Sequence, residues 1–374
     1  MAPVPFTNSA SNICLKLSKE GILRMDEAPM PVLNPDEVLV HMKCTGICGS
    51  DIHFWKEGKI GDLAVTDDLI LGHECAGLVV HVGANVKKLI NVGDRVAVEP
   101  QLPCGKCYLC QQGDYNLCLD VDFLGVPGMP GRDASIHGSM QRYKSVRPEF
   151  AHKIPDSMSY AEGALVEVFS VAYHGIEKAG GLELGKPCVV AGCGPIGLAT
   201  LMLADNAGAT PIVVTDISAD RLKFARELVP SVITYQVQPK LGAEGNAAEI
   251  RKLFGTEEWQ MPPYVLECTG VESSINTCCY VTRRAGCLTV LGVSGKNDID
   301  NFPFMHLSFS EIDVRFINRY KSSWPPVINL IASGKINAKK FVTHSFPLEK
   351  AVDALEIVAD PLIPTVKVVI EDKD

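Results

Sequence analysis

The sequence predicts an α/β protein in which a doubly wound parallel sheet is inserted into a β-barrel domain. Up to about Met158, short apolar runs such as residues 37–42 (EVLVHM) lie between Gly, Pro and Asn residues, as expected for the strands of a compact barrel. Beyond Met158, helical patterns alternate with fully apolar strands such as residues 187–191 (PCVVA), which are typical of parallel sheets buried on both faces. After about Val314 this alternation ends, and residues 364–370 (PTVKVVI) form a predicted strand that returns to the barrel.

The composition is that of a globular protein with two domains. A chain of 374 residues, 47% hydrophobic and 21% charged, is long enough for two cores of ordinary size. The formal net charge of −9 and the lack of a Lys/Arg cluster argue against nucleic acid as a partner. The sequence has no apolar run long enough to cross a bilayer, and residues 1–12 lack the features of a signal peptide. We therefore expect a cytosolic protein without a membrane partner.

Four of the fourteen cysteines are closely spaced, and this spacing is that of a metal site. Cys104, Cys107, Cys110 and Cys118 follow the pattern C-x2-C-x2-C-x7-C, with Pro and Gly residues that turn the chain between them. Four thiolates at such offsets can close around one tetrahedral Zn²⁺ and leave no open coordination position, which predicts a structural zinc site. The alternative is a chance grouping, which is weak because buried structural cysteines rarely recur at chelating offsets.

A second set of potential ligands is dispersed along the chain. It comprises Cys48, the adjacent pair His73 and Glu74, and Glu167 in a helical segment. A thiolate, an imidazole and a carboxylate suit a catalytic zinc that keeps a position for water or substrate. Each of these residues taken singly is more often structural than ligating, so the prediction depends on their combination with a nucleotide-binding domain.

A glycine motif that follows the strand at residues 187–191 predicts the nucleotide site. Residues 192–197 read GCGPIG, which is G-x-G-x-x-G in the strand-turn-helix setting that brings a pyrophosphate to a helix N-terminus. The next strand ends at Asp216, whose carboxylate is placed to accept hydrogen bonds from ribose hydroxyls and would repel a 2′-phosphate. Ile217 supplies no guanidinium to reverse that preference, so NAD is favoured over NADP, and Arg221 is expected to cover the adenine or the ribose edge. The alternative is a glycine-rich turn that binds no nucleotide.

The motif Gly72-His73-Glu74-x-x-Gly77, which continues to Gly83 and Val86, resembles the signature of zinc-containing medium-chain alcohol dehydrogenases. The four-cysteine loop is similar to the structural-zinc lobe of that family, and the likeness covers essentially the whole chain. It implies a GroES-like catalytic domain (residues 1–165), a Rossmann NAD-binding domain (166–313) and a return to the catalytic domain (314–374). The sequence Cys-Gly-Ser-Asp-x-His, the His-Glu pair and Glu167 resemble the polyol branch of the family.

The resemblance also implies roles for individual residues. Cys48, His73 and Glu74 would bind the catalytic zinc, with Glu167 either a direct ligand or hydrogen-bonded to water on the metal. The substrate side would include Ser50, Phe54, Arg319 and Tyr320. The cofactor contacts implied by the motif and the family together are Gly192, Gly194, Pro195, Ile196, Gly197, Asp216, Arg221, Val293, Ile317, Asn318 and Arg319.

The implied reaction is the oxidation of a secondary hydroxyl of a sugar alcohol by hydride transfer to NAD. L-Arabinitol, which would give L-xylulose, is the first candidate, because Phe54 stands where sorbitol and xylitol enzymes commonly have tyrosine; sorbitol, xylitol and galactitol are the alternatives. Ser50, with His53 or zinc-bound water held by Glu167, would relay the proton, and the alternative for His53 is a hydrogen-bonded residue that lines the cleft. Val168, in place of the usual proline, departs from the branch.

Two other classes of protein compete with this interpretation. A zinc-free NADPH quinone reductase would need neither the metal ligands nor Asp216, and a crystallin-like structural protein would not need intact Cys48, His73 and Glu74. The family also implies a homotetramer, with residues 287–293 as the candidate interface strand.

Overall fold

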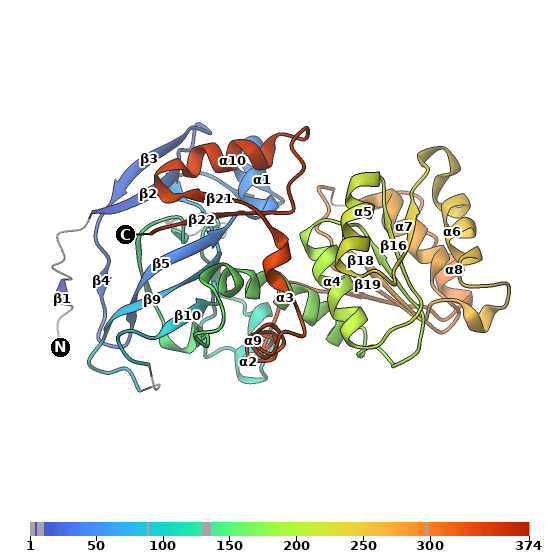
Figure 1. Ribbon diagram of the computed structural model, residues 1–374, viewed down its shortest axis with the longest axis horizontal. Helices are drawn as coiled ribbons and strands as arrows, with labels where there is room; N and C mark the ends of the chain where they lie inside the picture. The colour runs from blue at the N-terminus through green and yellow to red at the C-terminus, as the bar shows by residue number, and fades with distance from the viewer. Residues whose placement is uncertain (1–3, 6–10, 88–89, 129–135, 297, 374) are drawn as a thin grey trace. The chain divides into compact units, whose positions relative to one another are not determined.

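The computed structural model describes residues 4–5, 11–87, 90–128, 136–296 and 298–373. The chain divides into two units, one of Met1–Glu167 with Trp324–Asp374 and one of Val168–Ser323 (Figure 1). This division confirms that an α/β unit is inserted into a β-rich unit. Most of residues 1–12, on which the prediction about a signal peptide depends, lie outside the described residues. In the part that is described, no helix is long and apolar enough to span a membrane.

The first unit is built around a seven-stranded sheet. Its order is β14-β10-β9-β5-β22-β21, with β13 also paired to β5, and all of these pairs are antiparallel except β21 with β22. The strands of this sheet are β5 (Val38–Gly46), β9 (Glu74–Val82), β10 (Arg95–Val98), β13 (Tyr143–Val146), β14 (Ala151–Lys153), β21 (Val342–Pro347) and β22 (Lys367–Glu371). The predicted C-terminal strand therefore does return to the first unit.

Smaller elements complete this unit. The short strands are β1 (Val4–Pro5), β2 (Asn12–Leu17), β3 (Leu23–Ala28), β4 (Val32–Leu33), β6 (Lys59–Ile60), β7 (Leu63–Ala64), β8 (Leu69–Ile70), β11 (Gln101–Leu102) and β12 (Asp122–Phe123). The α-helices are α1 (Gly49–Glu57), α2 (Tyr108–Gln111), α9 (Trp324–Ala332) and α10 (Ala351–Ala359), and α3 (Tyr160–Lys178) contains the boundary with the second unit. The 3-10 helices are η1 (Tyr115–Leu117), η2 (Pro148–Phe150), η5 (Ala338–Phe341) and η6 (Leu348–Lys350).

The second unit contains a six-stranded parallel sheet of order β17-β16-β15-β18-β19-β20. Its strands are β15 (Cys188–Ala191), β16 (Ile212–Asp216), β17 (Ile233–Gln236), β18 (Tyr264–Glu267), β19 (Cys287–Val290) and β20 (Asp313–Phe316). Its helices are α4 (Pro195–Asn206), α5 (Ala219–Leu228), α6 (Gly242–Lys252), α7 (Glu272–Val281) and α8 (Phe304–Phe309), with η3 (Pro239–Leu241) and η4 (Glu258–Gln260).

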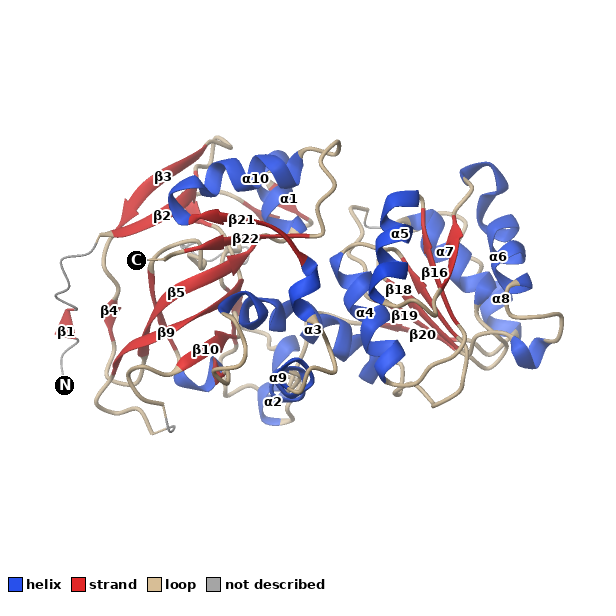
Figure 2. Ribbon diagram, viewed as in Figure 1, coloured by secondary structure: helices blue, strands red, loops and turns tan. Residues whose placement is uncertain are grey.

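The predicted doubly wound sheet is confirmed in this unit. Helices α4 and α5 pack against β15, β16 and β17, and α7 packs against β18 and β19 (Figure 2). The strand order reverses between β15 and β18, and ligands of such sheets bind at the carboxyl ends of the strands beside this reversal. The fold therefore directs a nucleotide to the turn that follows β15.

Two predictions concern the end of the inserted unit. A return to the first unit at residue 314 would cut through β20, which pairs along its length with β19, and the unit extends to Ser323. The strand that begins at Cys287 was the candidate interface, but β19 is buried and hydrogen-bonded on both sides, to β18 and β20. The fully apolar pattern of the other strands is missing from β20, because none of its four residues is buried and two of them, Asp313 and Arg315, are charged.

Candidate zinc centres and cofactor site

The four clustered cysteines converge on one point of the first unit. The Sγ atom of Cys107 lies 3.5 Å from that of Cys110 and 3.8 Å from that of Cys118, and the Sγ atoms of Cys104 and Cys110 are 4.0 Å apart. Four thiolates at about 2.3 Å from one tetrahedral zinc would be roughly 3.8 Å from one another, so the cluster fits the ion. The four cysteines supply all four ligands of a tetrahedral zinc, as in a structural zinc site.

Backbone N–H groups donate hydrogen bonds to the cysteine sulfur atoms, which favours the thiolate form that binds a cation. The N–H of Cys107 donates to the Sγ of Cys104 at 3.3 Å, and the N–H groups of Cys104 and Asp120 donate to the Sγ of Cys118 at 3.3 Å each. Such bonds, with that of Cys110 the strongest, lower the pKa of the Cys107 thiol to about 6. These N–H groups favour the thiolate form of Cys107, which is the form that binds zinc.

The lobe that carries the cysteines is anchored by Glu99, which the sequence did not single out. Its carboxylate accepts hydrogen bonds from the hydroxyl of Tyr115 at 2.9 Å and from the amide of Gln101 at 3.3 Å, and it pairs with Nε2 of His152 at 2.9 Å. The ring of His152 stacks on Trp324, with centroids 5.2 Å apart. The zinc lobe is thus tied through a buried carboxylate to the barrel.

Cys48, His73 and Glu74 form the second metal site. Cys48 is the N-cap of α1, whereas His73 and Glu74 lie at the start of β9, and one ligand atom from each residue lies within 4.8 Å of the others. His73 and Glu74 are buried, and Nδ1 of His73 makes no hydrogen bond within the described ranges. A thiolate, an imidazole and a carboxylate around a shared point fit a zinc with an open position, as a catalytic zinc requires.

Asp51 holds the two halves of this site together, although the sequence analysis did not assign it a role. It is fully buried in α1, and its carboxylate accepts the N–H of Cys48 at 2.9 Å and the N–H of Gly72 at 3.1 Å. Its Oδ1 also lies 3.8 Å from Nδ1 of His73. Burial raises the pKa of Asp51, and the charge of His73 opposes that shift. The sequence did contain a signal for this role, because Asp51 is an acidic residue three positions after the N-cap Cys48, as in a capping box.

Lys367 in β22 contacts the third ligand. Its Nζ donates to Oε1 and Oε2 of Glu74, each at 2.7 Å, and to the carbonyl oxygen of Ile47 at 3.0 Å. A Cβ atom on Gly46 would overlap the Glu74 carboxylate, so the glycine makes room for it. The sequence offered no local signal for Lys367, because it lies far from Glu74 along the chain.

Three further predicted residues of the first unit, Ser50, His53 and Glu167, differ in how close they lie to the metal ligands. The Oγ atom of Ser50 is 3.4 Å from Nε2 of His73, whereas His53 is exposed on α1 and pairs through Nδ1 with Glu57 at 2.7 Å. Glu167 is buried and close enough to Cys48 that its charge contributes to a raised thiol pKa, after burial and Glu74. It is not among the three residues whose ligand atoms converge.

Phe54 is placed differently from the sequence-based expectation. Its ring is 1% exposed and belongs to the apolar core of the barrel, together with residues such as Leu15 and Leu71. The contact between Phe54 and substrate therefore stays a prediction, and in this structure apolar neighbours cover the ring. Its position in α1, which places the side chain on the buried face of the helix, explains the difference.

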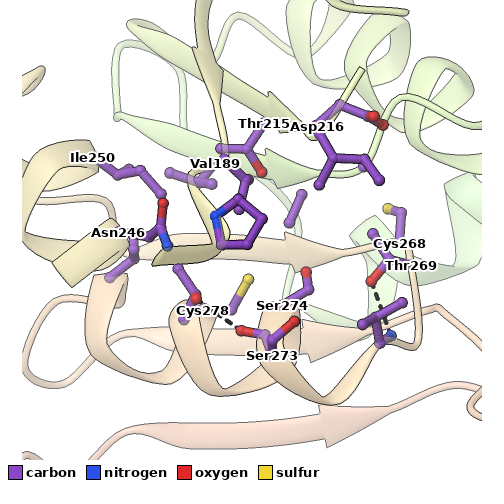
Figure 3. A pocket seen from close by; sticks show the side chains of 18 of the residues that line it. Val189, Thr215, Asp216, Asn246, Ile250, Cys268, Thr269, Ser273, Ser274 and Cys278 are labelled. Carbon is purple, nitrogen blue, oxygen red and sulfur yellow. Dashed lines mark hydrogen bonds between the residues drawn. The ribbon is translucent and has the colours of Figure 1, made fainter. Parts of the chain in front are cut away.

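The glycine motif lines a cavity of about 430 Å³ in the second unit (Figure 3). Gly192 has a φ of +99°, and a Cβ on Gly197 would overlap the carbonyl oxygen of Gly192, so both positions need glycine. Among the predicted residues, Gly192, Gly194, Asp216 and Arg221 line the cavity. The lining residues that sequence reasoning missed include Ile217, Val237, Pro239, Asn246, Cys268 and Thr269.

Asp216 is held rigidly at the end of β16. Its Oδ2 accepts the N–H of Cys193 at 2.8 Å, and its Oδ1 accepts the N–H of Ser218 at 2.8 Å. The carboxylate is therefore linked to the glycine turn on one side and to the N-cap of α5 on the other. This arrangement points a fixed negative charge at the position that a ribose would take.

The other predicted cofactor residues lie around the same edge of the sheet. Pro195 and Ile196 begin α4, while Val293 follows β19 and is exposed. Ile317, Asn318 and Arg319 follow β20, where Arg319 has a φ of +54°, and Tyr320 after them is buried. Because the carboxyl ends of parallel strands share one edge, these segments come to the side of the sheet that carries the glycine turn.

Comparisons with known proteins agree with both sites. Residues 34–156 match the alcohol dehydrogenase GroES-like domain, and residues 195–333 match the zinc-binding dehydrogenases. The chain is 48% identical over 341 residues to an L-arabinitol 4-dehydrogenase of Talaromyces emersonii, covering 90% of this chain and 85% of that one. It is 40% identical over 348 residues to a sorbitol dehydrogenase of Gallus gallus, covering 93% of each chain.

A solved structure gives the same result for the fold. An Escherichia coli oxidoreductase of unknown specificity, involved in membrane biogenesis, superposes with a TM-score of 0.85 at 31% identity, covering 98% of this chain and 100% of that one. The chain belongs to the zinc-containing medium-chain alcohol dehydrogenase family. It is a zinc-dependent dehydrogenase, with a structural zinc site at Cys104, Cys107, Cys110 and Cys118 and a catalytic zinc site at Cys48, His73 and Glu74.

Proposed function

We propose that the protein is a polyol dehydrogenase that oxidises L-arabinitol to L-xylulose with NAD⁺. The observation that carries the proposal is the three-ligand set of Cys48, His73 and Glu74, in a chain whose nucleotide cavity ends in the carboxylate of Asp216. The 48% identity to an L-arabinitol 4-dehydrogenase supports the substrate. The 40% identity to a sorbitol dehydrogenase makes D-sorbitol the second candidate.

Each bound group supplies one part of the chemistry. Cys48, His73 and Glu74 would hold a zinc, which would supply Lewis-acid chemistry to a secondary hydroxyl of the substrate. NAD⁺ accepts the hydride from the adjacent carbon. The oxidation therefore yields a ketose, a proton and NADH. The protein has to hold the hydroxyl, exclude competing ligands from the metal and conduct the proton to solvent.

The residues of the first unit divide these tasks. Ser50 would take the proton, and the 3.4 Å between its Oγ and Nε2 of His73 supports a place beside the metal ligands. His53, exposed and paired with Glu57, would pass the proton to solvent from the same helix. Glu167 would act through water rather than as a direct ligand, since it lies beside the convergent ligand set and not within it.

The residues of the second unit would serve the cofactor and the substrate. Asp216 is expected to accept hydrogen bonds from the adenosine ribose, and Arg221 to cover the adenine or the ribose edge. Arg319 and Tyr320 would supply hydrogen-bond donors to the hydroxyl groups of the polyol. The positive φ of Arg319 supports a functional role for this segment, because such backbone strain in a non-glycine residue concentrates at functional sites.

A substrate panel tests the proposal. We expect the highest kcat/KM with L-arabinitol among L-arabinitol, xylitol, galactitol and D-sorbitol, and a clear preference for NAD⁺ over NADP⁺. Complete zinc removal should abolish NAD⁺ reduction but leave NADH binding, as followed by fluorescence. A higher kcat/KM with D-sorbitol would select the second candidate, and turnover by fully demetallated protein would contradict the zinc mechanism.

We also propose a homotetramer in which copies meet along β20 instead of β19. β20 is the last strand of the parallel sheet, and Phe304, Phe309 and Phe316 are exposed on it and on α8. Pairing of two β20 strands would cover an open sheet edge. Light scattering after size exclusion should give four chains, and Phe316→Lys should reduce that number.

A cytosolic location is part of the same proposal. None of the fourteen cysteines, all of which lie in the described ranges, forms a disulfide, which is typical of a reducing compartment. Fractionation of cells that express the full chain would test this location, and recovery in a secreted fraction would contradict it.

A further inference from the structure

Lys367 is a buried cation that no step of the reaction outlined above uses. It begins β22, and its side chain is 2% exposed. Its three hydrogen bonds, two to the Glu74 carboxylate at 2.7 Å and one to the carbonyl oxygen of Ile47 at 3.0 Å, use all three N–H donors of an ammonium group. All three N–H donors of the lysine therefore have acceptors only while the carboxylate of Glu74, a metal ligand, accepts two of them.

The surroundings of Lys367 keep it charged. Both oxygens of the Glu74 carboxylate lie 2.7 Å from its Nζ and its side chain is 2% exposed, so the ammonium group is paired with a negative charge rather than with solvent. A fixed positive charge thus lies within hydrogen-bond distance of a carboxylate that the zinc also needs. The two cations compete for the same negative charge.

The position of the Glu74 carboxylate is also restricted on its other side. A side chain on Gly46 would overlap it, and the adjacent residue of the same turn, Ile47, supplies the carbonyl that holds Lys367. The carboxylate is confined between the glycine, the lysine and the shared point of the ligand set. It has little freedom to leave Lys367 when a metal binds.

We propose that Lys367 is a positioning residue that shares the Glu74 carboxylate with the zinc, so that the metal is held less tightly and stays a stronger Lewis acid. A thiolate and a carboxylate together neutralise a divalent ion, and the ammonium group restores one positive charge beside it. A metal with more residual charge stabilises negative charge on an oxygen more strongly. The inference rests on the zinc-dependent function but does not depend on the polyol.

Zinc affinity tests this inference without any substrate. We expect Lys367→Met, which removes the competing positive charge and keeps the side-chain length, to lower the Kd for zinc at the catalytic site by about tenfold or more, measured by competition with a chelator of known affinity. The same variant should have a lower kcat, because the zinc becomes a weaker Lewis acid. Lys367→Arg keeps the charge and should restore both values to within about threefold of the parent.

A spectroscopic measurement separates this role from a purely structural one. With Co²⁺ in place of zinc, the visible bands should shift in Lys367→Met, because Glu74 then gives its full charge to the metal, and should keep their positions in Lys367→Arg. The matched control is Lys16→Met, which removes another ion-paired lysine of the same unit, 2.8 Å from Asp26. This control should leave the zinc affinity and the Co²⁺ spectrum unchanged.

The direction of the change in affinity decides the outcome. An unchanged or weaker zinc affinity in Lys367→Met would overturn the inference, since it would mean that the lysine only preorganises Glu74. If Lys367→Met does not fold, Lys367→Arg remains decisive, because tighter zinc binding in a variant that keeps the charge would equally overturn it. Failure of the proposed substrate would leave these zinc measurements unaffected, so the two proposals fail separately.

Discussion

The carboxylate of Glu74 occupies the space that a side chain on Gly46 would need. Gly46 is the last residue of β5, which pairs with Glu74 at the start of β9. We predict that Gly46→Ala pushes the carboxylate away from the ligand set, so that zinc falls from about two ions per chain to about one and NAD⁺ reduction is lost. Metal analysis and activity assays measure both effects.

The neighbouring Gly49→Ala is the control for this prediction. A Cβ at Gly49 would meet no atom within 4 Å, and alanine favours the helix that starts there. We expect two zinc ions and ordinary activity in this variant. Two zinc ions and full activity in Gly46→Ala would show that Glu74 has another position available.

Asp51→Asn should weaken the catalytic zinc site. An amide keeps one acceptor oxygen for the N–H of Cys48 or of Gly72, but not for both, and it removes the negative charge 3.8 Å from His73. Changes to residues that orient metal ligands cost about 10- to 100-fold in metal affinity, and we expect a loss in that range. Chelator competition measures it, with the exposed Asp353→Asn as control, and an unchanged Kd would refute the role.

Asp216→Asn should relax the cofactor preference. The amide oxygen can keep the hydrogen bond from Cys193, at 2.8 Å in the parent, whereas the amide nitrogen replaces the oxygen that accepts the N–H of Ser218, so the charge and one of two backbone hydrogen bonds are lost. We expect the ratio of kcat/KM with NADP⁺ to that with NAD⁺ to rise about tenfold, which corresponds to about 1.4 kcal/mol of relieved repulsion. Asp220→Asn in the first turn of α5 is the control and should leave the ratio unchanged.

Phe54→Tyr should destabilise the protein and leave the order of polyols unchanged. The ring is 1% exposed, so the new hydroxyl would be buried among apolar side chains. Burial of a hydroxyl without a partner costs about 1–3 kcal/mol, and denaturant unfolding should show a loss of that size. A variant that is as stable as the parent and prefers another polyol would restore the sequence-based role of Phe54.

Cys107→Ser should remove the structural zinc and spare the cofactor site. One ligand of four is lost in a lobe held by the metal, by Glu99 and by few apolar contacts, so we expect about one zinc ion per chain and earlier proteolysis within residues 104–118. NADH binding, followed by fluorescence, should not change. Retention of two zinc ions would contradict the assignment of the cluster.

Local spacing in the sequence was sufficient to predict several features of the protein. The glycine turn at residues 192–197, the acidic residue at the end of the next strand and the four-cysteine loop each lie within a short segment. The residues of each feature are close in sequence, so their spacing alone indicates what they bind. The structure confirms that the cysteines converge and that the glycine turn lines a cavity. Fully apolar strands predicted the parallel sheet for the same reason.

Tertiary structure alone decided which residues surround the catalytic ligands. Lys367 reaches Glu74 across 293 residues of sequence, and Asp51 bonds to Gly72 across 21. The same packing placed Phe54 in the apolar core of the first unit. No sequence motif indicates which face of helix α1 is buried. Sequence order therefore determined the kinds of ligand this dehydrogenase has. The pairing of the C-terminal strand β22 with β5 decided the charge beside them, because electrostatic contacts depend on distance in space.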